Sequence, residues 1–365
     1  MAGRQVDLAA PEGAGARAYL AEPLQGSGPG LVLCSENPAA LRGLADLLAE
    51  EGYVVLASRH DGFDAQLAAL RARPNCRGRI GVVAFGACVA PALRAAARGD
   101  FDCAVAYCGA YRAAVLDAVR NIKVPVVLHW AGEQPIESEP GDSVETHAYP
   151  GVAPGFALAD SPGYDTQAAA MAYSRTLGLL RKVLGPHYDL SSLWEAHRAC
   201  EFVTRDAGAT MRTMVDEPYV NHIPTLTGGY GAKDLYRFYK HHFIPKSPKD
   251  MRNIPVSRTI GADRVVNEGV LCFTHDTEID WMLPGVKPTG KYVEVPIVGV
   301  ITFRGDKLCH EHIYWDQASV LVQIGLLDPA GLPVAGRASA AKVLDAGLPS
   351  NELMDNWPQS AEKES

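Results

Sequence analysis

The stretch Ile80-Gly81-Val82-Val83-Ala84-Phe85-Gly86-Ala87-Cys88-Val89-Ala90 contains a short apolar run, a group of small residues and the start of an alanine-rich helix. A strand that is apolar on both faces is typical of a parallel sheet that helices cover on both sides. Four similar apolar runs surround this stretch, at residues 30–34, 52–57, 103–107 and 124–129, and helical segments such as 38–51 and 90–98 separate them. This alternation predicts a series of strand–helix–strand units.

Cys88 stands at the turn between the strand at residues 80–85 and the following helix. A sharp turn of this kind exposes a nucleophilic side chain, while nearby backbone N–H groups form an oxyanion hole. The start of the helix also favours the thiolate form of a cysteine. The alternative is a buried cysteine in an ordinary strand-to-helix turn, and the residues alone leave both interpretations open.

The chain has 365 residues, more than the roughly 250 at which a single hydrophobic core stops growing. A helix at residues 166–183 ends at Gly185-Pro186, a pair that stops a helix. Beyond it, helical segments lead into alternating segments that predict a curved antiparallel sheet, at residues 254–260, 264–275, 292–303 and 307–316. We predict an α/β domain at 1–185, an α+β domain at 189–330 and a C-terminal extension at 331–365 with a partly disordered tail.

The composition excludes several classes of partner. The formal net charge is −8 and no run is rich in Lys or Arg, so we expect neither nucleic acid nor a membrane surface as a partner. The first residues lack an apolar signal core, and no run reaches the ~18 apolar residues of a membrane helix, which favours a cytoplasmic protein. The 8 cysteines form neither CxxC pairs nor a disulfide framework, so we expect reduced thiols.

Residues 1–185 resemble the dienelactone hydrolase (carboxymethylenebutenolidase) family of α/β-hydrolases. The resemblance rests on the Gly86-Ala87-Cys88 elbow, the Ser35-Glu36-Asn37 turn and the segment 149–157. It implies an α/β-hydrolase sheet in which Cys88 is the nucleophile and Glu36 controls it. It also implies an aspartate after the strand that follows the elbow, and a histidine just before Gly155-Phe156.

Two of the three partners of the nucleophile are absent from this sequence. Gln134 stands at the aspartate position and Pro154 at the histidine position, and proline neither accepts nor donates a proton. Removing the base from such a relay costs orders of magnitude in rate, so we predict that the N-terminal domain is catalytically degenerate. The alternative is a hydrolase of a lactone or ester, in which Glu133 and His147 replace the missing acid and base beside Glu36.

The run Lys307-Leu308-Cys309-His310-Glu311-His312-Ile313-Tyr314-Trp315-Asp316-Gln317 carries acid, base and hydroxyl groups at alternate positions. Successive side chains of a strand point to opposite faces. One face therefore carries a polar set, His310, His312, Tyr314 and Asp316. The other face carries Glu311, Ile313 and Trp315. A polar face indicates either plain exposure to solvent or a catalytic surface.

The region 190–328 resembles the SnoaL-like polyketide cyclase branch of the nuclear transport factor 2-like superfamily. The resemblance rests on Pro288-Thr289-Gly290, Gly305-Asp306-Lys307, and Asp316 before a helix that ends in Gln323-Ile324-Gly325. It implies a cone-shaped sheet around a helix, with Asp316 as the base that removes a proton next to a carbonyl. Partial burial raises the pKa of such a base, and the enolate needs a hydrogen-bond donor, which we expect to be His312 or Tyr314.

Five further residues are expected at the pocket of this cone. We place Asn221 and His222 on its wall, His275 at its rim, and Asp280 and Trp281 in a loop over its mouth.

A metal site is not expected. His310 and Asp316 would lie about 20 Å apart along an extended strand, which one ion cannot bridge. The set of His312, His222 and Asp316 has no compact ligand motif behind it. We therefore predict neither a metal nor a cofactor.

Three functions stay open at this point. The leading one is a cofactor-independent acid/base enzyme of the isomerase, cyclase or dehydratase type, which acts on a small, oxygenated, partly apolar carbonyl compound. The second is a hydrolase that uses Cys88. The third is a non-catalytic ligand-binding or assembly protein. We expect a homodimer, since superfamily members with this cone often pair through their sheets.

Overall fold

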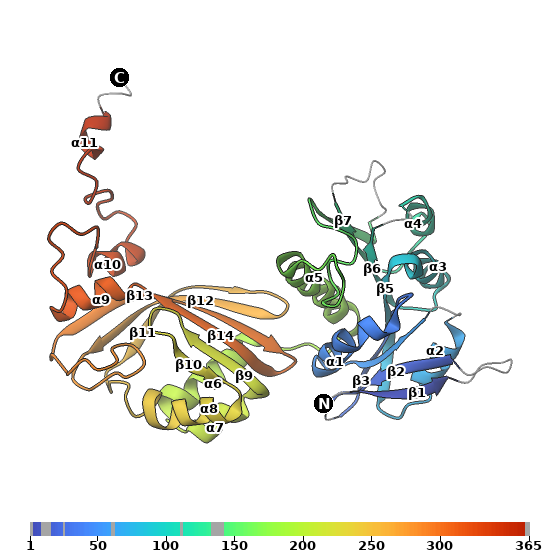
Figure 1. The fold of residues 1–365 in the computed structure, drawn as a ribbon, viewed down its shortest axis with the longest axis horizontal. Helices are drawn as coiled ribbons and strands as arrows, with labels where there is room; N and C mark the ends of the chain where they lie inside the picture. Colours follow the sequence, from blue (N-terminus) through green and yellow to red (C-terminus); the bar gives the residue numbers. More distant parts are fainter. Residues whose placement is uncertain are drawn as a thin grey trace. The chain divides into compact units, whose positions relative to one another are not determined.

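The computed structural model describes residues 3–8, 16–24, 26–59, 63–109, 112–132 and 142–361. The chain divides into two units, Met1–Tyr188 and Asp189–Ser365, and each is built on a sheet of its own (Figure 1). Within the described ranges, no helix has the length and apolar character needed to cross a membrane.

The first unit is an α/β layer structure, as predicted. Its eight-stranded sheet has the order β1 (Arg4–Leu8), β2 (Ala16–Ala21), β4 (Val54–Ser58), β3 (Gly28–Cys34), β5 (Cys76–Phe85), β6 (Cys103–Cys108), β7 (Val126–Ala131) and β8 (Val144–Tyr149). From β4 to β8 all neighbours pair in parallel, and β1 and β2 are antiparallel. The five central strands expected from the sequence are all present, with ends displaced by a few residues.

Helices cover both faces of this sheet. They are α1 (Arg42–Glu50), α2 (Asp64–Arg71), α3 (Val89–Arg98), α4 (Arg112–Val119) and α5 (Thr166–Leu184). Figure 1 shows α3 and α4 on one side and α5 on the other. Strands β3, β4 and β6 are buried along their whole length, because both of their faces meet helices rather than water.

A tight turn joins β5 to α3, as the sequence predicts. The 3₁₀ turn Gly86–Cys88 (η2) follows Phe85, and Gly86 has a φ of 58°, a left-handed value that glycine adopts without strain. A Cβ on Gly86 would lie 3.3 Å from Glu36 Oε2. The side chain of Glu36 therefore reaches the turn that carries Cys88.

The second unit is built on a six-stranded, mostly antiparallel sheet. Its order is β10 (Thr227–Tyr230), β9 (Met214–His222), β14 (Lys307–Trp315), β13 (Tyr292–Arg304), β12 (Arg264–Thr274) and β11 (Arg252–Ile260). Strands β14 and β9 pair in parallel, and the other neighbouring strands of this sheet pair antiparallel. Together with the first sheet, this confirms the predicted fold class of α/β plus α+β.

The helical region at the start of the second unit is divided into short segments. It consists of α6 (Leu190–Arg198), the π-helical segment η3 (Ala199–Val203) and α7 (Ala207–Arg212), and strand β9 then begins at Met214. Arg205 has a φ of 52°, and the Asp206 side chain caps α7, so the helix breaks here. Helix α8 (Ala232–Phe238) and the π-helical segment η4 (Tyr239–Phe243) complete the layer.

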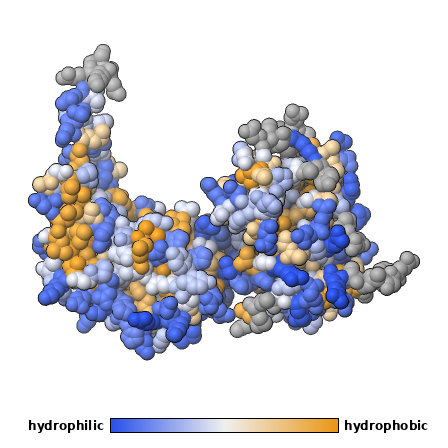
Figure 2. Space-filling model, viewed as in Figure 1, coloured by the Kyte–Doolittle hydropathy of each residue, from blue (hydrophilic) through white to orange (hydrophobic). Residues whose placement is uncertain are grey.

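The chain beyond residue 316 forms three short helices, α9 (Gln317–Ile324), α10 (Ala338–Leu344) and α11 (Trp357–Ser360). Ala340 of α10 is buried with Val270 and Cys272 of β12, so part of the predicted extension packs on the second sheet. Apolar side chains stay exposed around α9 and α10 (Figure 2), among them Leu326 and Leu344. Residues 362–365 lie outside the described ranges, and the predicted disorder of the tail stays a prediction.

His129 of β7 is a buried polar group inside the first unit. Its Nδ1 lies 2.9 Å from the Tyr149 hydroxyl, and its Nε2 lies 3.1 Å from Thr176 Oγ1. Burial, together with the nearby positive charges of His147 and Arg175, lowers the pKa of His129 to about 3. His129 is therefore neutral in the folded unit over the whole physiological range.

We predict that His129 makes the first unit sensitive to acid. The pKa of His129 in the folded unit lies below the unfolded value of roughly 6.5, so the unfolded chain binds more protons below that pH. The free energy of unfolding of the first unit therefore decreases as the pH falls from 6.5 toward 3. At pH 5 the loss is about 2 kcal/mol. In His129→Gln, the free energy of unfolding of the first unit should change less between pH 7 and pH 5 than it does in the wild type.

Amide hydrogen exchange of peptides from β5 to β7, corrected for the intrinsic exchange rate at each pH, measures this opening free energy. His187→Gln is the matched control, because His187 is exposed, and it should keep the wild-type slope. An unchanged slope in His129→Gln would contradict the prediction.

Candidate functional site

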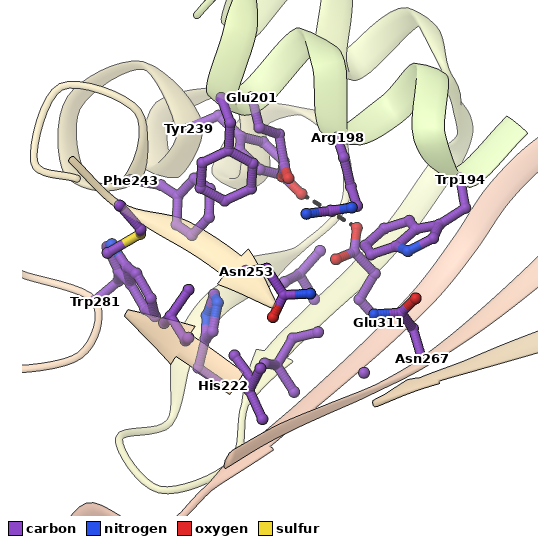
Figure 3. Close-up of a pocket in the computed structure, with 17 residues that line it drawn as sticks. Trp194, Arg198, Glu201, His222, Tyr239, Phe243, Asn253, Asn267, Trp281 and Glu311 are labelled. Carbon is purple, nitrogen blue, oxygen red and sulfur yellow. Dashed lines mark hydrogen bonds between the residues drawn. The ribbon is translucent and has the colours of Figure 1, made fainter. Parts of the chain in front are cut away.

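A cavity in the second unit lies between one face of its sheet and the helical layer (Figure 3). Its volume is about 680 Å³, including the space at its mouth. Aromatic and aliphatic side chains form most of the wall. The charged, imidazole and amide side chains in it are Arg198, Glu201, His222, Asn253, Asn267 and Glu311.

The alternation of strand side chains places Glu311 and Ile313 of β14 in the cavity. Ile313 pairs with Gly299 of β13, and Gly299 pairs with Asn267 of β12. A Cβ on Gly299 would lie 3.0 Å from the Ile301 side chain and 3.3 Å from Ile313. Glycine at this position therefore keeps the floor of the cavity open beside Glu311.

Asn253 of β11 also faces the cavity, as Figure 3 shows. A Cβ on the neighbouring Gly269 would lie 2.3 Å from Asn253 Oδ1, so the glycine makes room for the amide. This Oδ1 atom is buried and has no hydrogen-bond partner among the described residues. Because a buried polar atom normally has a partner, Asn253 is suited to bind a polar group of a ligand.

The two π-helical segments supply the opposite wall. Glu201 comes from η3, and Tyr239 and Phe243 come from η4. A π-turn shifts the side chains that follow it around the helix axis, and such turns often occur at functional sites.

An ionic cluster joins the helical wall to the sheet. His197 Nε2 lies 3.3 Å from Glu201 Oε1 and 3.1 Å from Glu311 Oε1. The Tyr239 hydroxyl donates a hydrogen bond of 3.4 Å to Glu311 Oε1. The side chains of His197, Glu201 and Glu311 are at most 5% exposed. Solvent therefore screens their charges only weakly, and the three groups must compensate one another.

The cluster shifts the pKa values of its members. Burial by itself lowers the pKa of His197, but the carboxylates of Glu201 and Glu311 outweigh it and raise the value to about 10. Burial raises the pKa of Glu201, and His197 opposes that shift. Burial and the nearby carboxylates also raise the pKa of Tyr239. The cavity wall therefore carries two carboxyl groups that share one positively charged histidine.

His222 and Trp281 line the cavity, where the sequence had placed them. The ring of His222 lies 5.0 Å from that of Trp281, and its Nδ1 lies 3.1 Å from the carbonyl oxygen of Thr227. Burial lowers the pKa of His222 to about 4. His222 is therefore a neutral wall residue whose Nε2 can accept a hydrogen bond.

The placement of Asp316 as the cavity base was wrong. Asp316 is exposed, and its side chain caps helix α9 by accepting hydrogen bonds from the backbone N–H and the hydroxyl of Ser319. An aspartate just before a helix satisfies N–H groups that have no partner within the helix.

His312 and Tyr314 also lie outside the cavity lining, on the sheet face opposite Glu311. Tyr314 is 43% exposed, and the ring of His312 packs edge-on against Tyr219 at 5.5 Å. The polar face of β14 therefore points away from the core and the cavity.

The remaining predicted pocket residues have other partners. Asn221 sits beside His312 in the strand register. Asp280 Oδ2 lies 3.1 Å from His242 Nδ1. His275 is fully buried, and its Nδ1 lies 3.1 Å from the hydroxyl of Thr289 in the predicted Pro-Thr-Gly turn. These three residues do not line the cavity.

Sequence reasoning missed Glu311, Glu201, His197 and Tyr239. One signal for Glu311 was present, since a single carboxylate stands between Cys309, Ile313 and Trp315 on the apolar face of its strand. A charged group on a buried face is rare unless it is paired. A second signal was the spacing of His197 and Glu201, because residues four apart meet on one face of a helix.

In the first unit, Cys88 is buried at the elbow. His147 Nε2 lies 2.9 Å from Glu145 Oε1 on the same strand, β8. A Cβ on Gly109 would lie 2.7 Å from Pro154 Cβ, so Pro154 packs closely on the end of β6. Glu133 and Gln134 lie outside the described residues.

Comparisons with known proteins match the two parts of the chain separately. Residues 57–184 match the model of the dienelactone hydrolase family. A protein of Azospirillum brasilense named "Putative carboxymethylenebutenolidase" is 26% identical over 218 residues, which are 46% of this chain and 94% of that protein. Carboxymethylenebutenolidase 1 of Cupriavidus pinatubonensis is 31% identical over 127 residues, which are 32% of this chain and 54% of that protein. The first resemblance drawn from the sequence is thus confirmed.

A solved structure matches the other part of the chain. It is a "Putative SnoaL-like polyketide cyclase" from Jannaschia, with 16% identity and a TM-score of 0.30, and the match covers 40% of this chain and 99% of that one.

We predict that Asp316 acts as a helix cap. Asp316→Ala should lower the stability of the second unit by about 1 kcal/mol, whereas Asp316→Asn should change it by only a few tenths, because asparagine also caps helices. Urea unfolding followed by tryptophan fluorescence measures both variants, since Trp194, Trp281 and Trp315 all lie in this unit. Equal losses in the two variants would argue against the cap.

Proposed function

We propose that the second unit is an acid/base enzyme that removes a proton next to a carbonyl group, with Glu311 as the base. The observation that supports this best is the Glu311 carboxylate itself, which is 4% exposed and lines the cavity. Figure 3 shows it beside the indole of Trp194. A general base must lie within hydrogen-bond reach of the proton that it removes, and a carboxylate on the cavity wall meets this requirement for a bound substrate.

His197 is a positioning residue in this proposal. Its imidazolium compensates part of the charge of the two carboxylates and holds Glu311 toward the cavity. Burial and the nearby carboxylates raise the pKa of Tyr239, so its hydroxyl keeps its proton and is the donor for the reaction. Tyr239 returns a proton to the enolate after Glu311 has taken one from carbon.

The wall of the cavity indicates the class of substrate. Trp194, Phe243 and Trp281 give flat apolar surfaces, and Asn253 and Asn267 give polar contacts on the sheet side. This combination fits a small, partly apolar molecule that carries oxygen functions. Isomerisation, cyclisation and dehydration all begin with the same proton removal, and the proposal covers this shared step.

The test is proton exchange at carbon. We expect the metal-free full chain to exchange the α-protons of 2-tetralone for deuterium in heavy water, followed by proton NMR. Glu311→Gln should slow this exchange by a factor of about 10² to 10⁴, the usual contribution of a general base. His312→Gln is the matched control from the next position of the same strand, and it should exchange at the wild-type rate.

Circular dichroism shows whether the Glu311→Gln variant is folded. Equal exchange in folded Glu311→Gln and in the wild type would overturn the proposal. If only His312→Gln lost the exchange activity, the residues that remove the proton would lie on the face of β14 that carries His312, and not in the cavity.

A second candidate function is ester or lactone hydrolysis in the first unit. It is favoured by the match to the dienelactone hydrolase family and by the elbow, where Glu36 reaches the turn that carries Cys88. The Cys88 thiol would give its proton to Glu36 and attack the carbonyl carbon, and a backbone N–H at the start of α3 would stabilise the oxyanion. The alkoxide would then leave with a proton, and water would hydrolyse the thioester and free Cys88.

This candidate predicts that Cys88→Ala hydrolyses p-nitrophenyl acetate at least 100-fold more slowly than the wild type. Cys76→Ala is the control, because Cys76 is a half-buried cysteine of the same unit. Release of p-nitrophenol, read by its absorbance, gives the rate. Hydrolysis that survives in Cys88→Ala would exclude the first unit as this hydrolase.

A further inference from the structure

Thr213 fixes the ring orientation of His197. His197 Nδ1 lies 2.6 Å from Thr213 Oγ1, and the Thr213 hydroxyl donates its own proton to the Thr210 carbonyl oxygen at 2.6 Å. The hydroxyl must therefore accept from Nδ1–H, so Nε2 is the nitrogen whose lone pair becomes free to bind an ion when the ring gives up its other proton. Metal-binding histidines are usually held in this way by a second group behind them.

The opposite nitrogen of the ring faces two carboxylate oxygens. Nε2 lies 3.3 Å from Glu201 Oε1 and 3.1 Å from Glu311 Oε1, yet it forms no hydrogen bond of ordinary geometry with any described residue. The three atoms all lie within 4.8 Å of one another. Ligands bound to a tetrahedral ion at about 2.0–2.1 Å stand roughly 3.3 Å apart, so small side-chain shifts would enclose an ion.

The surroundings also fit a cation. His197, Glu201 and Glu311 are all at most 5% exposed, and two buried carboxylates beside one imidazole carry more negative than positive charge. A divalent ion with a neutral imidazole would balance these charges. Glu201 and Glu311 line the cavity whereas His197 lies behind them, so a fourth coordination position would open toward a ligand.

The ligand set indicates which class of ion would bind. One imidazole nitrogen and two carboxylate oxygens suit Zn²⁺ and other divalent transition ions. Ca²⁺ and Mg²⁺ prefer sites made only of oxygen.

We propose that His197, Glu201 and Glu311 bind one divalent transition-metal ion, and that this ion inhibits the enzyme by occupying the carboxylate that removes the substrate proton. The binding site stands on the geometry alone, and the inhibition rests on the proposed function. Sequence spacing hides such a site, because β14 brings Glu311 to the helix pair His197 and Glu201 only in the folded unit.

Cobalt is the probe for the site, because its spectrum distinguishes nitrogen and oxygen ligands from the thiolates of the 8 cysteines. The full chain, freed of metal by EDTA and dialysis, is titrated with Co²⁺. We expect one equivalent to bind with visible d–d bands and without a thiolate-to-cobalt charge-transfer band. Inductively coupled plasma mass spectrometry checks the stoichiometry.

Two variants and one control test the ligands. Glu201→Gln should weaken Co²⁺ binding at least tenfold, and Thr213→Val should weaken it about 10- to 100-fold, the usual effect of removing a group behind a ligand. His242→Gln is the control, since His242 forms a half-buried pair with Asp280 at 3.1 Å in the same unit, outside the cluster, and it should bind as the wild type does. Circular dichroism shows whether each variant is folded.

The outcomes separate the inference from the proposed function. Absence of binding, equal binding by wild type and folded Glu201→Gln, or a thiolate band would overturn the site. Saturating Co²⁺ should slow 2-tetralone exchange at least tenfold, and EDTA should restore it; unchanged or faster exchange would overturn the inhibition. A metal-free chain that binds Co²⁺ but exchanges no protons would contradict the proposed function and leave the site intact.

Discussion

The charge balance among His197, Glu201 and Glu311 is the constraint on which the second unit depends. A charge buried without a partner is costly, and breaking a buried ion pair costs about 3–5 kcal/mol. All three groups must therefore meet, although two come from the helical layer and one from β14. This requirement ties the helices to the sheet and also places a carboxylate on the wall of an apolar cavity.

The surrounding backbone is shaped to keep that cavity open. Two π-helical segments turn Glu201 and Tyr239 inward, and Gly299 and Gly269 leave space on the sheet side. Aromatic rings then exclude water, which strengthens each electrostatic interaction inside. The first unit shows a contrasting arrangement, in which Pro154 packs against Gly109 at the position where the resemblance to dienelactone hydrolases implies a histidine.

The two faces of β14 show where sequence reasoning succeeds and where it fails. The alternation placed His310, His312 and Tyr314 on one face and Glu311 and Ile313 on the other, and the structure agrees. We predicted that the polar face of β14 lines the cavity, but the cavity lies on the apolar face, which carries Glu311 and Ile313. On such a face the informative residue is the single exception, and here the exception is Glu311.

The sequence by itself determined the fold class, the strand–turn–helix around Cys88, and which side chains share a face of each strand, because these follow from local periodicity and turn chemistry. The positions of His222 and Trp281 at the cavity were expected from the resemblance to the cone-shaped cyclases, not from periodicity. The role predicted for Asp316 from the sequence was wrong, because Asp316 is the N-terminal cap of the helix that begins at Gln317. Only the tertiary structure decided the cluster, since Glu311 reaches His197 and Glu201 through the parallel pairing of β14 with β9 and the packing of α6. No local pattern records an attraction between charges that lie far apart in the chain.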